Sequence, residues 1–151
     1  MTVRNNEVFD NLGWGVVATG TSFMEAANNV ITRNGNCGFA LWSDEATGVF
    51  TNNIVTDNGW RDEWVCPQVG VWANGLVENF EIRYNDVWDN AAGDYRDMDE
   101  LTGVDGNISA DPLFCDAPSG DWRVDSGSPA LAGDCAPMGA RGDCSSPGSP
   151  F

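Results

Sequence analysis

The stretch Asn28-Asn29-Val30-Ile31-Thr32-Arg33-Asn34 decides the fold, because close copies of it recur along the chain. Each copy has a residue pair ending in Asn, an apolar residue two positions further on and another Asn three positions after that. The copies span residues 5–11, 28–34, 52–58 and, in a degenerate form, 84–90. From copy to copy the second residue of the pair moves on by 23, 24 and 32 residues. Such a period is typical of supersecondary units stacked into an array.

Aligning the copies on these pairs produces columns of like residues. Two columns are apolar, and they comprise Val3, Ala26, Phe50 and Ile82, and Val8, Ile31, Val55 and Val87. Further columns follow in each repeat, namely Gly15, Gly38 and Gly70, then Val16, Phe39 and Val71, and then Ala18, Leu41 and Ala73. The apolar positions alternate as they do in strands. We therefore expect two or three short strands per repeat, separated by sharp bends, and no long amphipathic helix.

Like residues that recur once per repeat imply a solenoid, in which parallel strands of successive coils lie about 4.8 Å apart. The apolar columns then line its interior. We interpret the Asn columns as structural, because Asn tolerates the left-handed backbone of a tight bend and stacked amides hydrogen-bond along a column. The two predicted ladders are Asn6, Asn29, Asn53 and Asn85, and Asn11, Asn34, Asn58 and Asn90.

Repeats of about two dozen residues with Asn at the bends resemble the right-handed parallel β-helix proteins of the pectate-lyase-like superfamily. The run 106–116 (GNISADPLFCD), followed by 120–124 and 127–131, resembles the closing segment of many secreted bacterial β-helix proteins. The resemblance implies an all-β fold, a right-handed parallel β-helix (solenoid) of about four to five coils over residues 1–105. It also implies a loop-rich C-terminal cap over residues 106–151. It specifies no reaction, because this fold hosts lyases, hydrolases, adhesins and spacers.

Composition excludes several functions. Seven basic residues, all Arg, stand against 23 acidic ones, which gives a formal net charge of −16. Such a surface repels nucleic acid phosphates and anionic lipid headgroups, and it suits cations such as Ca²⁺. Without His, the chain cannot build a Ser-His-Asp triad, a Cys-His dyad or a His-ligated zinc site. No apolar run approaches the roughly 20 residues that span a bilayer, so we expect no membrane insertion.

The chain has five cysteines, an odd count that leaves at least one unpaired within it if the others oxidise. Cys115, Cys135 and Cys144 lie in a Gly-, Pro- and Ser-rich region, which fits a stapled cap formed in an oxidising compartment. If the repeats stack, Cys37 lies one coil below the segment of Cys66, and the two could pair or remain buried free thiols. With the resemblance, this predicts an extracellular or cell-surface location. Because the chain enters its first repeat at once, without a signal peptide, we interpret it as a piece of a longer protein or as an open reading frame that lost its upstream part.

An insertion in the third repeat is the first candidate for a binding site. Asn34 and Gly38 are four residues apart, whereas Asn58 and Gly70 are twelve apart, so eight residues are added at one bend. Insertions in solenoids form loops on one face, often the binding face. The candidate ligand-binding residues are Trp60, Arg61, Asp62, Trp64 and Trp72. The indoles could stack on the apolar faces of sugar rings, or they could fold back and cover apolar surface of the coil.

Charged residues just before the second Asn column form the only set that resembles a catalytic site. Asp10, Arg33, Asp57 and Asp89 occupy equivalent positions, and stacking would place Arg33 between Asp10 and Asp57 in an interleaved ion ladder. Polysaccharide lyases of this fold bind Ca²⁺ through carboxylates and often use Arg or Lys as the base. The resemblance therefore makes Arg33, Asp57, Arg83 and Asp89 the catalytic candidates, although no family motif matches residue by residue. The alternative is a surface charge ladder.

An acidic run at residues 94–100 is the candidate metal site. Ca²⁺ prefers oxygen ligands, and the candidate ligands here are Asp94, Asp97 and Asp99. The spacing does not follow the EF-hand pattern, and the alternative is a solvated acidic loop that leads into the cap. The tripeptide at 141–143, Arg-Gly-Asp, matches an integrin-binding sequence that is short enough to arise by chance.

Two functional hypotheses follow. The first is a non-catalytic β-helix scaffold or binding segment of an exported bacterial protein, with a polysaccharide as partner and no required cofactor. The second is a carbohydrate-active enzyme (a polysaccharide lyase or glycoside hydrolase) or a remnant of one, which needs carboxylates, alone or with Arg, within about 3–6 Å of one point. In addition, the first coil would expose unpaired strand edges, which predicts either a homo-oligomer formed through that coil or a missing upstream domain.

Overall fold

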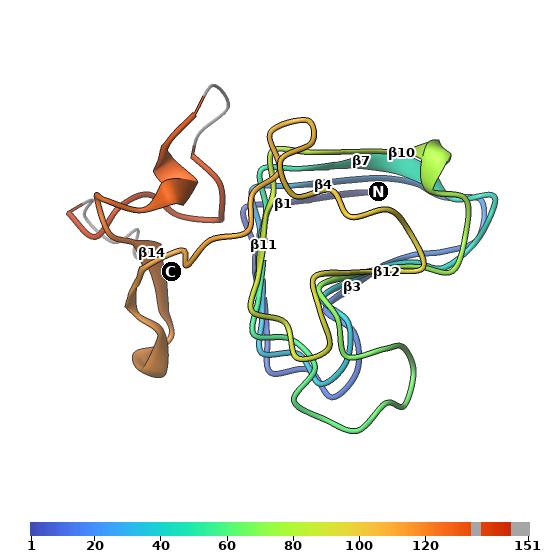
Figure 1. The fold of residues 1–151 in the computed structure, drawn as a ribbon, viewed down its shortest axis with the longest axis horizontal. Coiled ribbons are helices and arrows are strands. Elements are labelled where there is room, and N and C mark those ends of the chain that lie inside the picture. The colour runs from blue at the N-terminus through green and yellow to red at the C-terminus, as the bar shows by residue number, and fades with distance from the viewer. Residues whose placement is uncertain (134–136, 146–151) are drawn as a thin grey trace.

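The computed structural model describes residues 1–133 and 137–145. The chain winds through four coils, each contributing three short strands (Figure 1). The first coil contains β1 (Thr2–Arg4), β2 (Glu7–Phe9) and β3 (Val16–Ala18), and the second contains β4 (Phe23–Ala27), β5 (Val30–Thr32) and β6 (Phe39–Leu41). The third contains β7 (Thr47–Thr51), β8 (Ile54–Thr56) and β9 (Val71–Ala73). The fourth contains a 3-10 turn, η1 (Val77–Asn79), followed by β10 (Phe80–Arg83), β11 (Asp86–Trp88) and β12 (Tyr95–Arg96).

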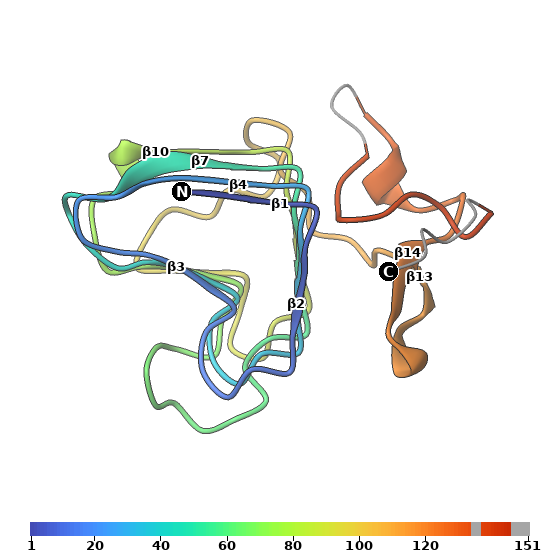
Figure 2. The ribbon, with the colours of Figure 1, turned by 180° about the vertical axis from the view of Figure 1, so that it is seen from behind.

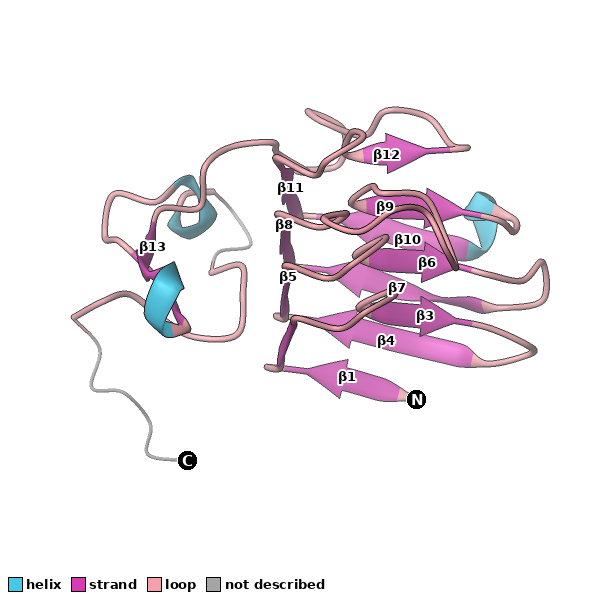
Figure 3. Ribbon diagram, turned by 90° about the horizontal axis from the view of Figure 1, so that it is seen from below, coloured by secondary structure: helices cyan, strands magenta, loops and turns pink. Residues whose placement is uncertain are grey.

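Equivalent strands of successive coils pair in parallel and build three four-stranded sheets (Figure 3). We call them sheet 1 (β1-β4-β7-β10), sheet 2 (β2-β5-β8-β11) and sheet 3 (β3-β6-β9-β12). Their register is that of the sequence columns, since Val3 pairs with Ala26, Ala26 with Phe50, and Phe50 with Ile82. The predicted all-β parallel solenoid is therefore confirmed.

Side chains that alternate inward from the three sheets form the core. Phe39 and Phe50 stack inside it with ring centroids 4.0 Å apart, and Ile31 is fully buried in the same cluster. At one end of the stack β1, β2 and β3 are edge strands. Beyond β12, Met98 and Leu101 of the acidic loop pack against the core. This loop therefore contributes apolar cover in addition to its charges.

Two ladders of Asn side chains run from coil to coil at the bends. In the first ladder, Oδ1 of Asn53 accepts both the backbone N–H and the Nδ2–H of Asn29, at 3.0 and 2.8 Å. Asn53 donates from the same two groups to Oδ1 of Asn85, and its Nδ2 also donates to the carbonyl of Ala26. Both predicted ladders are confirmed, and the first gains a fifth member; they comprise Asn6, Asn29, Asn53, Asn85 and Asn107, and Asn11, Asn34, Asn58 and Asn90.

The left-handed backbone at each bend belongs to the residue before the ladder Asn. This corrects the expectation that a single Asn both turns the chain and stacks. Positive φ angles between 51° and 56° occur at Asn5, Asn28, Asn52 and Tyr84 in one column, and at Asp10, Arg33, Asp57 and Asp89 in the other. Asn and Asp accept this conformation readily, whereas Arg and Tyr rarely adopt it. The charged column of the sequence is thus first of all a column of bends.

The C-terminal segment lies along the outer face of sheet 2 (Figure 1 and Figure 2). It contains β13 (Phe114–Asp116), η2 (Ala117–Ser119), β14 (Asp121–Val124) and η3 (Pro129–Leu131), with β13 and β14 antiparallel. Trp122, Val124 and Ala130 belong to one buried cluster with Val30 and Ile54 of sheet 2. Expected as a cap at the end of the solenoid, this segment instead covers one flank, because β5 and β8 present apolar side chains outward there.

Two disulfides form, Cys37–Cys66 and Cys115–Cys144. The first resolves the alternatives for Cys37 and Cys66 in favour of pairing, and the second staples the C-terminal segment. Cys135 lies outside the described residues. Each helix within residues 1–133 and 137–145 is a single turn, and none could cross a membrane.

Substituting Asn53→Ala is expected to lower the free energy of unfolding by about 3 kcal/mol, because buried groups of Asn29 and the carbonyl of Ala26 lose their partners. Urea denaturation followed by circular dichroism measures it. The exposed Asn74→Ala is the matched control and should change stability by no more than about 0.5 kcal/mol. Equal effects of the two substitutions would contradict a stabilising role for the ladder.

Candidate functional site

A row of three indoles lies on the outer face of sheet 3. The ring centroids of Trp14 and Trp42 are 5.2 Å apart and those of Trp42 and Trp72 are 5.4 Å apart, each pair edge to face. The neighbouring outward positions of β3 and β6 hold Val17 and Ala40, whose small side chains leave room for the rings. We call Trp14, Trp42 and Trp72 the aromatic row.

The aromatic row is fixed in place and partly exposed. Nε1 of Trp72 donates to Oδ2 of Asp97 at 2.9 Å, and Trp14 and Trp72 pack against a buried cluster that contains the Cys37–Cys66 pair. Trp42 is 36% exposed. Sequence reasoning identified Trp72 alone, because the three residues stand before, after and within their strands and so fall in different columns. A search for any aromatic residue near the third strand of each repeat would have found all three.

The eight-residue insertion forms a loop that projects from the corner between sheets 2 and 3 (Figure 1). Val65 packs against the same buried cluster as the aromatic row, so the loop borders the row. The guanidinium carbon of Arg61 lies 4.7 Å from the ring centroid of Trp64, which is 63% exposed. Inside the loop, Nε2 of Gln68 donates to two backbone carbonyls, which gives it a defined shape.

The predicted ligand-binding residues fall in separate places. Trp72 lies in the aromatic row, while Arg61 and Trp64 lie together on the loop beside it. Asp62 is exposed on the same loop. Trp60 turns the opposite way, toward the bend after sheet 2, where its Nε1 donates to a carbonyl of the second coil at 2.7 Å. Trp60 and Trp64 therefore do not form one platform.

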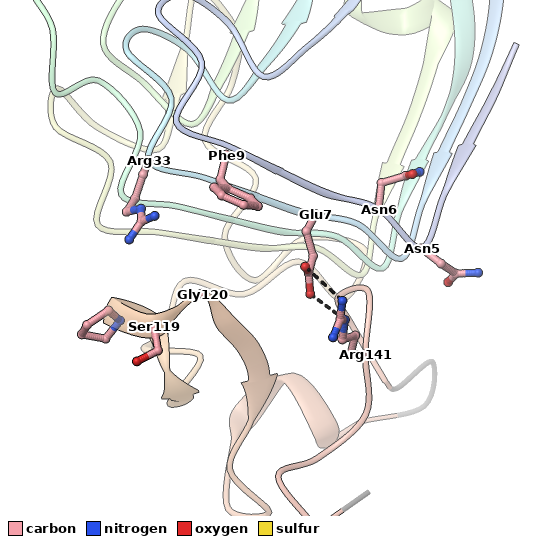
Figure 4. A pocket seen from close by; sticks show the side chains of 9 residues that line it. Asn5, Asn6, Glu7, Phe9, Arg33, Ser119, Gly120 and Arg141 are labelled. Atoms are coloured by element: carbon pink, nitrogen blue, oxygen red, sulfur yellow. Dashed lines mark hydrogen bonds and ion pairs between the residues drawn. The ribbon is translucent and has the colours of Figure 1, made fainter. Parts of the chain in front are cut away.

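Two hollows lie in the seam between sheet 2 and the C-terminal segment. The first, which we call the Trp60 hollow, has a volume of about 700 Å³ and is lined by Asp10, Arg33, Asp57, Trp60, Ala117, Pro118 and Trp122. The second, the Glu7 hollow, measures about 530 Å³ and shares Arg33 and Pro118 with the first (Figure 4). Across it, Nε of Arg141 lies 2.7 Å from Oε1 of Glu7. The Arg of the Arg-Gly-Asp tripeptide is therefore part of the seam.

The expected ion ladder is a single ion pair. The guanidinium of Arg33 donates from Nε and Nη2 to the two carboxylate oxygens of Asp10, at 3.0 and 2.7 Å. It also lies over Trp122, 4.8 Å from the ring centroid. Among the described residues Asp57 forms no ion pair, so Arg33 does not bridge Asp10 and Asp57 as expected. Because this ion pair is bidentate, the Nε and Nη2 edge of the guanidinium is occupied by Asp10.

The four catalytic candidates are not brought to one point. Arg83 pairs with Glu81 within β10 of sheet 1. Asp57 and Asp89 follow β8 and β11 at the bend after sheet 2. Burial in the seam raises the pKa of Asp57, and the nearby carboxylates of Asp89 and Asp111 add to this, while Thr56 and Arg33 oppose it. Arg83 is therefore separated from the other three candidates, which share one column.

Two of the three candidate calcium ligands, Asp94 and Asp97, are engaged within the protein, and the third, Asp99, is exposed. Asp94 accepts from Nδ2 of Asn90 at 3.0 Å and from Oγ of Ser109 at 2.8 Å, so it terminates the second Asn ladder. Asp97 accepts from Trp72. Within the part of the chain that the structure describes, no three acidic or cysteine side chains gather in an arrangement suited to a metal ion. Calcium binding stays a prediction.

Asp86 is a buried carboxyl group that sequence reasoning missed. It stands in the column of Val30 and Ile54, where an outward side chain is covered, and its Oδ1 accepts from the backbone N–H of Ala110 at 3.0 Å. Its Oδ2 is buried without a partner among the described residues. Burial raises the pKa of Asp86 to about 7, with Asp94 and Asp111 adding to the shift. The only sequence signal was an acid after the apolar Val30 and Ile54 in a column that begins with Glu7.

The comparisons with known proteins identify the fold family. A family described as right handed beta helix region matches residues 1–105, about two thirds of the chain and all four coils. The chain belongs to the right-handed β-helix family. A comparison with curated proteins returns no match, and neither does a comparison with solved structures. The match ends where the C-terminal segment begins, so the family accounts for the coils and their ladders.

Substituting Asp86→Asn is expected to stabilise the protein above neutral pH. A carboxyl whose pKa is about 7 when folded and 3.8 when unfolded must take up a proton on folding between these pH values, so the protein loses stability as pH rises from about 4 to 7. The stability of the variant relative to the natural protein should therefore increase over that range, by up to about 4 kcal/mol. Urea denaturation at a series of pH values measures it, and a difference independent of pH would contradict the assignment.

Proposed function

We propose that this chain is a non-catalytic β-helix segment that binds a glycan along the aromatic row. The row itself carries the proposal, since three indoles lie 5.2 and 5.4 Å apart on a rigid sheet. Indole rings offer large apolar contact areas to the C–H faces of sugars, and their polar N–H can stay hydrogen-bonded. Because packing and the Asp97 contact already hold the rings, little side-chain entropy is lost on binding.

The surroundings of the aromatic row support a sugar ligand. A sugar site combines apolar contact with a few polar groups that orient hydroxyls. Arg96 pairs in register with Trp72 and is exposed, and Asp97 lies next to it. Arg61 and Trp64, on the loop that borders the row, extend the same combination of charge and indole. An exposed aromatic surface of this kind is typical of an interaction site.

Binding is favoured over catalysis by how the candidate catalytic groups are placed. Arg33 is engaged by Asp10, and Arg83 is engaged by Glu81 in another sheet. A lyase base must instead be free to approach a sugar carbon, with a carboxylate-binding group beside it. The enzyme hypothesis therefore has less support than a binding role.

We further propose that the segment belongs to an exported bacterial protein and acts in an extracellular or cell-surface setting. The resemblance to secreted β-helix proteins supports this, as do the two disulfides, which persist in oxidising compartments. The strongly acidic surface would suit a neutral glycan, or an acidic one bridged by Ca²⁺.

Substituting Trp42→Ala is expected to weaken glycan binding at least about tenfold, or 1.4 kcal/mol, because the central indole contacts both of the others. A glycan array with and without Ca²⁺ identifies the ligand, and isothermal titration calorimetry then measures the loss.

Trp60→Ala, which removes an indole in the seam, is the matched control and should leave the affinity for that glycan unchanged. Loss of binding in Trp60→Ala but not in Trp42→Ala would place the site elsewhere. Release of unsaturated sugar products from a polyuronate would contradict the non-catalytic role.

A further inference from the structure

The Trp60 hollow has the size and lining of a small-molecule site. Its volume of about 700 Å³ lies within the range of about 300–1,000 Å³ that is common for such sites. Ala117, Pro118 and Trp122 of the C-terminal segment supply an apolar wall, and the bend after sheet 2 supplies the charged residues. The hollow lies at a different sheet from the aromatic row, and the glycan proposal does not involve it.

One indole of the hollow is both exposed and fixed. Trp60 is 54% exposed, and the hydrogen bond from its Nε1 to the carbonyl of Arg33 holds the ring orientation. An indole face attracts cations through its quadrupole. The seam already shows this interaction, because the guanidinium of Arg33 lies 4.8 Å from the ring centroid of Trp122. Among the described residues, no Arg side chain packs over the face of Trp60.

One carboxylate of the hollow has no direct ion-pair partner among the described residues. Arg33 and Asp10 neutralise each other in a bidentate ion pair. Asp57 lines the same hollow and forms no ion pair among the described residues. Partial burial and the carboxylates of Asp89 and Asp111 raise its pKa, while Thr56 and Arg33 lower it. Asp57 is exposed, so a cation can reach it, and a cation bound beside it would offset the repulsion from Asp89 and Asp111.

We propose that the Trp60 hollow binds a small organic cation with an ammonium group, held between the indole face of Trp60 and the carboxylate of Asp57. The apolar wall favours a ligand with a hydrocarbon body next to its ammonium group. A metal ion fits less well, because no three acidic or cysteine side chains gather for one in the described ranges.

Benzylammonium, an ammonium group on an apolar ring, is a suitable probe, and benzyl alcohol is its neutral counterpart. Titration calorimetry on the full chain at neutral pH and low salt should show benzylammonium binding at least about fivefold more tightly. Asp57→Asn should abolish this preference. Asn is the appropriate replacement because Asp57 has a φ of 56°, a left-handed conformation that Asn tolerates. Trp60→Leu should weaken the binding of both probes.

Two variants serve as controls. Glu45→Gln removes one exposed negative charge at another bend, and Trp42→Ala removes an indole of the aromatic row; neither should change the affinity for benzylammonium. Thermal unfolding confirms that each variant is folded. The proposal is overturned if neither probe binds, if both bind equally, or if Asp57→Asn keeps the preference for the cation. It stands or falls independently of the glycan site.

Discussion

The amide side chains of the two Asn ladders form the constraint on which the rest of the structure depends. At each step one buried Oδ1 accepts a backbone N–H and a side-chain N–H from the coil before it, as between Asn34 and Asn58 at 3.1 and 2.9 Å. These groups are buried, so leaving them unpaired would cost the full penalty for losing their hydrogen bonds with water. Sliding one coil by a residue would break every rung that joins it to the neighbouring coils. The ladders therefore fix the register in which all three sheets stack.

That register determines where function can be placed. With the coils held in phase, Trp14, Trp42 and Trp72 come to lie on one face although they are far apart in sequence. The same phase turns Val30 and Ile54 outward from sheet 2, and the C-terminal segment covers them. Covering that flank creates the seam and its two hollows. The aromatic row thus arises from the coils themselves, with the inserted loop at its border. The Trp60 hollow arises where the inserted loop and the C-terminal segment meet the coils.

The fold was predictable because a repeat reports the same environment several times. The columns that begin with Val3, Val8 and Gly15 correctly predicted where the three strands of each coil lie, and the Asn columns predicted the ladders. The site was predictable only in part. Trp60 and Trp64 are four residues apart, yet the loop sends them to opposite sides, and no periodic signal describes a single loop. The flank position of the C-terminal segment was likewise missed, because alternation within β5 predicts an outward side chain at Val30 without saying what covers it.

Asp86 and Arg33 show a second limit. Asp86 shares its column with the apolar Val30 and Ile54, and Arg33 shares its column with three Asp residues. The guanidinium of Arg33 packs over Trp122, which lies 89 residues further along the chain. Contacts with the C-terminal part of the chain determine the pKa of the buried Asp86 and the packing of Arg33. They follow from the assembled structure and from no local pattern.

Native-state hydrogen exchange tests the role of the ladders most directly. The backbone N–H groups of Asn29, Asn53 and Asn85 are bonded to side chains rather than to a strand, so they report on the rungs alone. If the rungs hold the coils together, these amides should exchange only through global unfolding, with the same free energy as the strand amides of β5 and β8. Exchange of these three amides at rates typical of loops, while the strands stay protected, would contradict the account.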